Sequence, residues 1–182
     1  MRVVVGITGA SGTVLAVRLL ENLNNVEKHL VMSESAKKVM SLETDYTYDY
    51  IKGLADYVYS DADIAANISS GSFKYDALVI IPCSSSTMAK IASGISDTLI
   101  TRTALVAMKE HRKFIIVPRE MPLSTIMIEN MLKLSSYNVI IAPAMPGYYS
   151  RPKTVDDMVN FVVSRILDLI GIENEISKRW QH

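Results

Sequence analysis

Short apolar runs rich in β-branched residues alternate along the chain with longer stretches whose apolar positions recur at helical spacing. Continuous apolar runs are typical of strands buried on both faces, and a 3.6-residue spacing is typical of amphipathic helices. The predicted strands are residues 2–7, 29–32, 76–82, 114–117 and 139–142, and the predicted helices are residues 13–23, 35–42, 86–93, 98–111, 123–134 and 155–170. This alternation favours a parallel sheet with helices on both of its faces.

The stretch from residue 45 to residue 74 shows no clear pattern. Residues 51–59 fit either a helix or a strand, and residues 61–66 fit the start of a helix. Just before this stretch, Ser33 and Ser35 are both candidate N-caps of the second predicted helix. A short hydroxyl side chain at that position accepts a hydrogen bond from a free amide of the first turn.

Composition limits the class of protein. Hydrophobic residues make up 49% of the 182 residues, enough for a sizeable core, and 21% charged residues exclude a disordered chain. No internal repeat or linker divides the sequence, so we expect one domain, residues 1–182. Lys and Arg together number 19, as do Asp and Glu, and this zero net charge argues against nucleic-acid binding.

The cysteine count and the apolar runs restrict the cysteine chemistry and the cellular location that we expect. Cys83 is the single cysteine, which excludes an intrachain disulfide framework and a multi-cysteine metal site. No targeting segment is visible, and no apolar stretch approaches the roughly 20 residues of a membrane span. We therefore expect a cytoplasmic protein that binds neither a membrane nor a metal ion.

The loop after the first predicted strand, residues 6–12, has the sequence Gly-Ile-Thr-Gly-Ala-Ser-Gly. Ligands of open α/β sheets bind at the carboxyl ends of the strands, so this loop is a candidate site. Its glycines permit a tight turn and close approach to a ligand, and free amides at the following helix start favour an anion. The spacing differs from the dinucleotide fingerprint and from the P-loop. We expect phosphate or flavin binding here; a strand-to-helix turn without a ligand is the alternative.

A second strand end, residues 82–87, has the sequence Pro-Cys-Ser-Ser-Ser-Thr. Four consecutive hydroxyl side chains exceed what one helix cap requires, and they predict neutral hydrogen bonds to a phosphate or to the edge of a flavin. A helix start with redundant caps explains the pattern equally well. Cys83 is expected to be a buried apolar residue and not a nucleophile, because no histidine lies near it in the sequence.

Charged residues follow the next predicted strand. Arg119 and Glu120 stand between Pro118 and Pro122, where they form either part of a site or a surface ion pair of little consequence. The segment 146–152, after the last predicted strand, is an aromatic loop that either covers a ligand or is an exposed connector.

Three basic residues on predicted helices add to these segments. Arg102 and Lys109 lie seven residues apart on one helix, so they share a face and either converge on an anion or remain solvated. Arg165 lies on the last predicted helix. It either joins such an anion site or pairs with Asp168, three residues later.

Six segments together resemble the UbiX-like flavin prenyltransferases in their order and spacing. These segments are residues 6–12, 68–72, 82–84, 101–102, 119–123 and 149–152, and the pair Arg179-Trp180 fits the same pattern. The resemblance implies a three-layer α/β/α, Rossmann-like (flavodoxin-like) parallel sheet. It also implies a homo-oligomer, expected to be a dodecamer, with the C-terminal segment 172–182 packing on a neighbouring subunit.

The resemblance implies a particular reaction. FMN binds in its reduced form as a substrate, and a dimethylallyl group from dimethylallyl monophosphate is joined to flavin N5 and C6, closing a fourth ring. No metal is needed for this step. The product, prenylated FMN, serves a partner decarboxylase of the UbiD type.

Individual roles follow from the same resemblance. FMN would be held by Gly9, Ala10, Ser11, Ser33, Ser84, Ser85, Ser86, Thr87 and Arg119. Dimethylallyl phosphate would be bound by Tyr149, Arg165 and Lys109. Catalysis would involve Glu120, Lys109, Arg102 and Ser11. Since sites of this family form between protomers, Tyr149 and Arg165 are expected to act across a subunit boundary.

These residue types suit the implied chemistry. Breaking an allylic C–O bond leaves negative charge on the phosphate, which Arg102, Lys109 and Arg165 would stabilise. The positive charge on the allyl group suits an aromatic face such as that of Tyr149. Glu120 is the candidate proton relay for the hydrogen lost from C6; the phosphate itself is the alternative base. Pairing with Arg119 is expected to keep Glu120 ionised.

Other interpretations remain open. Ser86 departs from the family, which often has a lysine or another long polar residue there. Residues 142–145, Ala-Pro-Ala-Met, also resemble the flavin-containing cysteine decarboxylases, although the early histidine of those enzymes is missing between residues 12 and 27. An FMN-dependent decarboxylase of a cysteine-containing substrate is therefore the second hypothesis. A non-catalytic FMN-binding protein is the third.

Overall fold

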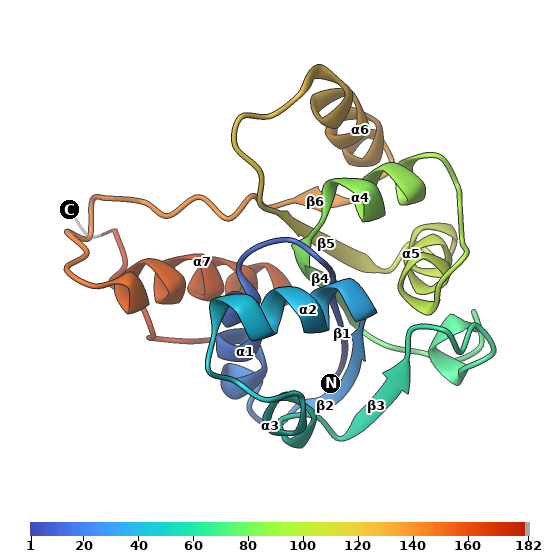
Figure 1. Ribbon diagram of the computed structural model, residues 1–182, viewed down its shortest axis with the longest axis horizontal. Helices are drawn as coiled ribbons and strands as arrows, with labels where there is room; N and C mark the ends of the chain where they lie inside the picture. Colours follow the sequence, from blue (N-terminus) through green and yellow to red (C-terminus); the bar gives the residue numbers. More distant parts are fainter. Residues whose placement is uncertain (181–182) are drawn as a thin grey trace.

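The computed structural model describes residues 1–180 and places a six-stranded parallel sheet between two layers of helices (Figure 1). The strands are β1 (Arg2–Ile7), β2 (Glu27–Met32), β3 (Tyr57–Ser60), β4 (Ala77–Cys83), β5 (Lys113–Pro118) and β6 (Ile140–Ile141). Their order across the sheet is β3-β2-β1-β4-β5-β6. This is the order of doubly wound Rossmann folds, and it reverses direction between β1 and β4. The expected three-layer α/β/α sheet is confirmed.

The helices divide between the two faces of the sheet. They are α1 (Thr13–Asn22), α2 (Glu34–Glu43), α3 (Tyr48–Gly53), α4 (Ser85–Ala92), α5 (Leu99–Lys109), α6 (Thr125–Ser136) and α7 (Val155–Ile170), with a 3₁₀ turn at Asn67–Ser69. One core packs α1, α2, α3 and α7 against the sheet, and the other packs α4, α5 and α6 against the opposite face. In β1, Val3 and Val5 belong to the first core and Val4 belongs to the second. This alternation explains the continuous apolar run.

The structure corrects the sequence-based assignment at three places. Residues 51–59 are both elements in succession, the end of α3 and then β3, and the helix start expected at 61–66 is wrong. The last strand is two residues long, not four, because it lies at the sheet edge and pairs only with β5. Ser33, not Ser35, caps α2: its hydroxyl accepts a hydrogen bond of 3.1 Å from the amide of Ala36.

Two peripheral segments leave the body of the molecule. We call residues 143–154 the arm and residues 172–180 the tail. The arm extends to the left of the sheet in Figure 1, and the tail runs back along α7 to the same end. Among residues 1–180, none of the helices has both the length and the apolar character that crossing a bilayer requires.

Candidate functional site

The loops that follow β1 and β4 are joined by Thr8. The amide and the hydroxyl of Thr8 both donate to the carbonyl oxygen of Pro82, at 3.2 and 2.9 Å. The same hydroxyl accepts a hydrogen bond of 2.7 Å from the amide of Ser84. Thr8 is 2% exposed, so water does not compete for these bonds. They hold the N-terminal ends of α1 and α4 side by side at the carboxyl edge of the sheet, where the strand order reverses.

The loop between β1 and α1 is constrained by two of its glycines. Gly12 has a φ of 110°, a conformation that side chains other than glycine rarely adopt. A Cβ atom at Gly9 would lie 2.6 Å from the Cβ of Ser35, so this loop packs closely against the start of α2. Ser11, between these glycines, is partly exposed, and no hydrogen bond holds its hydroxyl within the described residues. The predicted loop therefore lies at the carboxyl edge of β1.

Glu43 also reaches this loop and was not among the predicted site residues. Its Oε2 atom accepts a hydrogen bond of 2.9 Å from the amide of Gly12, at the N-terminal end of α1. A carboxylate is stabilised there by the helix dipole and by free amides. No sequence spacing links position 43 to position 12, because the contact joins two different strand–helix units.

The serine-rich strand ends contain both helix caps and free hydroxyls. Ser84 caps α4: its hydroxyl accepts from the amide of Thr87 at 3.3 Å and donates to the Thr87 hydroxyl at 2.9 Å. The redundant-cap explanation therefore applies to Ser84 and Thr87. Ser85 and Ser86 are exposed at the same helix start, and the hydroxyl of Ser86 lies 3.3 Å from that of Ser84. The Ser85 hydroxyl has no partner within residues 1–180, so it remains available to a ligand.

Arg119 and Glu120 lie at the carboxyl end of β5, and both are exposed. The expected ion pair between them is wrong for the protomer: the Glu120 carboxylate accepts a hydrogen bond of 3.3 Å from the amide of Met121 instead. The guanidinium of Arg119 has no partner within the described residues, and β5 lies beside β4.

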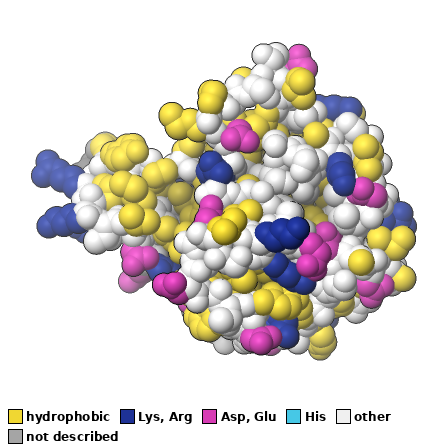
Figure 2. Space-filling view, viewed as in Figure 1, with side chains coloured by type: hydrophobic (Ala, Val, Ile, Leu, Met, Phe, Trp, Pro, Cys, Tyr) yellow, Lys and Arg dark blue, Asp and Glu magenta, His cyan; other side chains and the backbone are white. Residues whose placement is uncertain are grey.

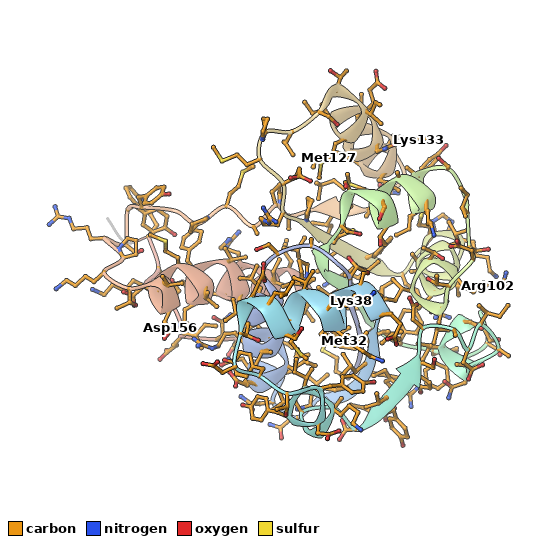
Figure 3. The ribbon with its side chains drawn as sticks, viewed as in Figure 1. Met32, Lys38, Arg102, Met127, Lys133 and Asp156 are labelled. Atoms are coloured by element: carbon orange, nitrogen blue, oxygen red, sulfur yellow. The ribbon has the colours of Figure 1, made fainter. Side chains whose placement is uncertain are left out.

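Lys109 lies at the opposite edge of the sheet. It is the last residue of α5, pairs with Glu110, and precedes the first residue of β5 by four positions. The seven residues of β4 separate the two edges by about 20 Å. Arg102, on the first turn of α5, points outward and has no side-chain partner within residues 1–180 (Figure 3). Convergence of Arg102 and Lys109 on one anion is therefore not met within one protomer, because α5 carries Lys109 away from the loops that follow β1, β4 and β5. We call these loops the flavin loops, after the ligand predicted for them.

A hollow of about 410 Å³ lies between the arm, α7 and the tail. Its lining consists of Tyr149, Phe161, Ser164, Arg165, Ser177, Lys178, Arg179 and Trp180. The ring of Tyr149 packs edge-on against Phe161 at 5.6 Å and against Trp180 at 5.0 Å between centroids. Tyr149 and Arg165 therefore line the same hollow, and Arg165 also pairs with Asp168, which is the alternative stated for it. The lining combines aromatic surface with three basic side chains, which suits an apolar group that carries a phosphate.

This hollow is separate from the flavin loops. The arm carries it away from the centre of the sheet in Figure 1, and hydrophobic side chains cover much of the corresponding end of the molecule in Figure 2. Met145 is 61% exposed and Tyr148 is 71% exposed on the arm. An exposed apolar surface of this kind is typical of contacts with another protein chain.

Cys83 lies beneath the site but takes no part in it. It is fully buried, and burial raises the pKa of its thiol to about 12. The reactive thiolate is therefore not formed near neutral pH. The expectation of a buried apolar residue at this position is confirmed.

The chain matches a known protein family and is similar to proteins of known function over nearly its whole length. The family model described as Flavoprotein matches residues 1–167. The chain is 61% identical over 180 residues to the flavin prenyltransferase UbiX of Thermoplasma acidophilum, an alignment covering 99% of this chain and 100% of the relative.

Two solved structures have nearly the same fold. The dodecameric FMN-dependent UbiX-like decarboxylase from Escherichia coli O157:H7 gives a TM-score of 0.97 at 50% identity, covering 100% of both chains. The complex of AnUbiX (PadA1) with FMN and dimethylallyl pyrophosphate gives a TM-score of 0.98 at 42% identity, covering 100% of this chain and 97% of the other.

Proposed function

Because the chain belongs to the flavoprotein family and to its UbiX-like flavin prenyltransferases, we propose that it transfers a dimethylallyl group from dimethylallyl monophosphate to reduced FMN. The group is joined to flavin N5 and C6, and the product is prenylated FMN. The observation that carries the proposal is the 61% identity to a flavin prenyltransferase, because it extends over 99% of this chain and so includes both the loops and the hollow.

The polar groups at the carboxyl edge of the sheet fit FMN. The amides at the starts of α1 and α4, the hydroxyls of Ser11 and Ser85, and the guanidinium of Arg119 are donors on three adjacent strands. A flavin nucleotide offers a phosphate and a polar ring edge as acceptors for such groups. We assign FMN binding to Gly9, Ala10, Ser11, Ser33, Ser84, Ser85, Ser86, Thr87 and Arg119.

The hollow fits the other substrate. Arg165 stabilises the phosphate as the allylic C–O bond breaks, and Lys178 adds positive charge around it. The rings of Tyr149 and Trp180 face the cationic allyl group. When bound, reduced FMN supplies the nucleophilic atoms N5 and C6. Glu120 takes up the proton that C6 loses, and Glu43 positions the loop at Gly12.

More than one copy of the chain completes this site. The flavin loops, the hollow and Lys109 lie in three different parts of the protomer, so neighbouring subunits bring them together. A homo-oligomer, and specifically a dodecamer, is supported by the dodecameric UbiX-like relative and by the exposed apolar arm. Packing of the segment 172–182 on a neighbour belongs to this proposal, although residues 172–180 contact α7 of their own chain and residues 181–182 lie outside the described part.

The recipient and the location complete the proposal. Prenylated FMN passes to a decarboxylase of the UbiD type, in keeping with the UbiX-like family. The cytoplasm is the proposed location, because a reduced flavin persists best in a reducing compartment. Cell fractionation tests the location, and transfer of the product to an apo-decarboxylase tests the recipient.

The reaction is tested by mass spectrometry of the flavin. The protein is mixed anaerobically with reduced FMN and either dimethylallyl monophosphate or the diphosphate. We expect FMN to gain one five-carbon unit, and faster with the monophosphate. Unchanged FMN with both donors contradicts the proposal. Loss of carbon dioxide from a cysteine-containing peptide, measured in parallel, would favour the decarboxylase instead.

A further inference from the structure

One carboxylate, that of Asp168 on α7, gathers hydrogen bonds from three side chains. Arg165 donates to its Oδ2 atom at 2.8 Å, and Asn174 donates to Oδ1 at 3.1 Å. Arg179 donates to both oxygens, at 2.8 Å to Oδ1. The Asp168 side chain is 22% exposed, so these bonds are partly shielded from solvent. A carboxylate with this many donors holds its partners in a defined geometry.

These bonds connect the tail to the wall of the hollow. Arg179 also donates to the carbonyl oxygen of Asn174 at 2.8 Å, which fixes its guanidinium between the tail and α7. The next residue, Trp180, packs edge-on against Tyr149 on the arm. Asp168 is therefore the point at which the tail, with its aromatic end, is fastened to α7.

Arg165 is held differently from Arg179. It makes one hydrogen bond to Asp168, and its side chain is 58% exposed, compared with 41% for Arg179. A guanidinium carries five N–H donors, so Arg165 keeps most of them for an anion in the hollow. The bidentate bond to Arg179 meanwhile keeps Asp168 occupied and ionised, and this guanidinium holds the pKa of Asp168 below its ordinary value.

We propose that Asp168 is a positioning residue for the allyl phosphate: it orients Arg165 toward the hollow and fastens Trp180 across it through Arg179. Asp168 itself does not touch the substrate. The inference rests on the proposed function, because that function assigns the hollow to dimethylallyl phosphate. It adds one residue that couples the phosphate-binding arginine to the aromatic wall.

Trp180 is the single tryptophan of the chain, so its fluorescence reports on the tail alone. We expect Asp168→Asn to raise the acrylamide quenching of Trp180, because the tail detaches. In the enzyme loaded with oxidised FMN, which does not react, the Kd of dimethylallyl monophosphate rises about tenfold in a titration followed by Trp180 emission. In turnover assays the KM for the allyl phosphate rises by a similar factor, and the KM for FMN stays unchanged.

Two variants and one control define the role. Arg179→Ala is expected to reproduce both effects without disturbing α7. The double variant should be no worse than Asp168→Asn alone, since Arg179→Ala removes a contact that Asp168→Asn has already broken. Asp168→Glu should restore part of the affinity. Glu173→Gln removes a carboxylate from the same tail that has no ion pair within the described residues, and it should leave the Kd and the quenching unchanged.

The outcomes separate this inference from the proposed function. Wild-type Kd and quenching in Asp168→Asn and Arg179→Ala would overturn the inference even if the enzyme prenylates FMN. Increased quenching with an unchanged Kd would overturn the positioning role. A wild-type protein that binds the allyl phosphate but never modifies FMN would contradict the proposed function, and the Kd values would still decide the role of Asp168.

Discussion

The flavin loops and the hollow are built by opposite means. The loops are fixed by backbone hydrogen bonds around one buried hydroxyl, that of Thr8. The hollow is held by side-chain pairs and ring contacts between the arm, α7 and the tail, most of them exposed. Buried backbone bonds set a geometry within one protomer, whereas exposed side-chain contacts are individually weak and depend on their surroundings. The geometry of the first region is therefore set within one protomer, whereas the geometry of the second can respond to a neighbouring subunit.

Loss of a phosphate-binding cation should reduce turnover more than any other change considered. Arg165→Ala and Lys109→Ala should each lower the turnover rate by about 100-fold or more, because each removes a cation from the departing phosphate. FMN binding, measured by absorbance of the retained flavin, should stay unchanged in both. Lys133→Ala, on the exposed face of α6 (Figure 3), is a matched control and should retain normal turnover.

Mixed oligomers of the two inactive variants test whether Lys109 and Arg165 of different copies share a site. Lys109 and Arg165 lie in different parts of one protomer, so a shared site takes them from different copies. Coexpression of both variants should therefore restore activity in those sites that receive one intact residue from each. Mixed oligomers as inactive as either parent would show that the two residues do not complete each other's site.

Removing the Thr8 hydroxyl should lower both the stability of the flavin loops and their affinity for FMN. Thr8→Val keeps the shape of the side chain but leaves the Ser84 amide without its acceptor and removes one of the two hydrogen bonds that the Pro82 carbonyl oxygen accepts. We expect the free energy of unfolding to fall by about 2 kcal/mol and FMN affinity to fall with it. Urea denaturation and flavin titration measure the two. Thr125→Val, at an exposed position of α6, should change neither; equal losses in the two variants would refute the role of Thr8.

Glu120→Gln should have a smaller effect, confined to rate. The amide keeps the size of the side chain and still accepts a hydrogen bond from Met121, so both substrates should bind normally. Turnover should slow by about tenfold, because the glutamine cannot take up the proton. Single-turnover kinetics with a Glu129→Gln control checks this. A wild-type rate would remove Glu120 from the mechanism and leave the phosphate as the base.

The smallest expected effect is a pH dependence of the free energy of unfolding, and it comes from His29, which lies outside both the flavin loops and the hollow. His29 is 1% exposed, with its ring nitrogens 2.8 Å from Glu27 and 2.8 Å from the Tyr59 hydroxyl. Burial lowers the pKa of His29, although the hydrogen bond to Glu27 opposes this. As the pH falls below the unfolded-state value of about 6.5, the unfolded chain takes up the proton first.

Stability contributed by neutral His29 is therefore present above about pH 6.5 and is lost as the pH falls through its folded-state pKa. Thermal melts at a series of pH values should show this loss in the wild type, and less of it in His29→Gln. His111→Asn is the matched control, since His111 is exposed. Identical pH profiles for His29→Gln and the wild type would contradict the assignment.

Features formed within one short segment of the chain could be predicted from the sequence, whereas contacts between distant positions could not. The sequence predicted the flavin loops because the glycines and hydroxyl residues of each loop lie within one short segment. Each segment directly follows a strand with a continuous apolar run. Glu43 was missed because its contact with Gly12 joins positions 31 residues apart, with no spacing rule between them. The sequence did not show that Lys109 lies apart from those loops within one protomer, because a shared helix face says nothing about which edge of the sheet each end reaches.

Residues 45–74 resisted assignment for a different reason. The helix α3 has six residues and β3 has four, too few for either periodicity to stand out. Exposed side chains also make up most of β3, which removes the apolar run of a central strand. The resemblance to a family placed Tyr149 and Arg165 in one site; their spacing of 16 residues, across the end of the arm and onto α7, would not have done so.

The brevity of β6 has a consequence for how copies of the chain associate. It pairs with β5 through two residues, after which the amides of Ala142 and Ala144 bond to β5 carbonyl oxygens, so this border of the sheet offers hardly any open ladder. A truncated border strand discourages strand addition by another molecule, and with it fibrous aggregation. Association of copies of the chain is therefore expected to use the helices and the arm and not this border of the sheet.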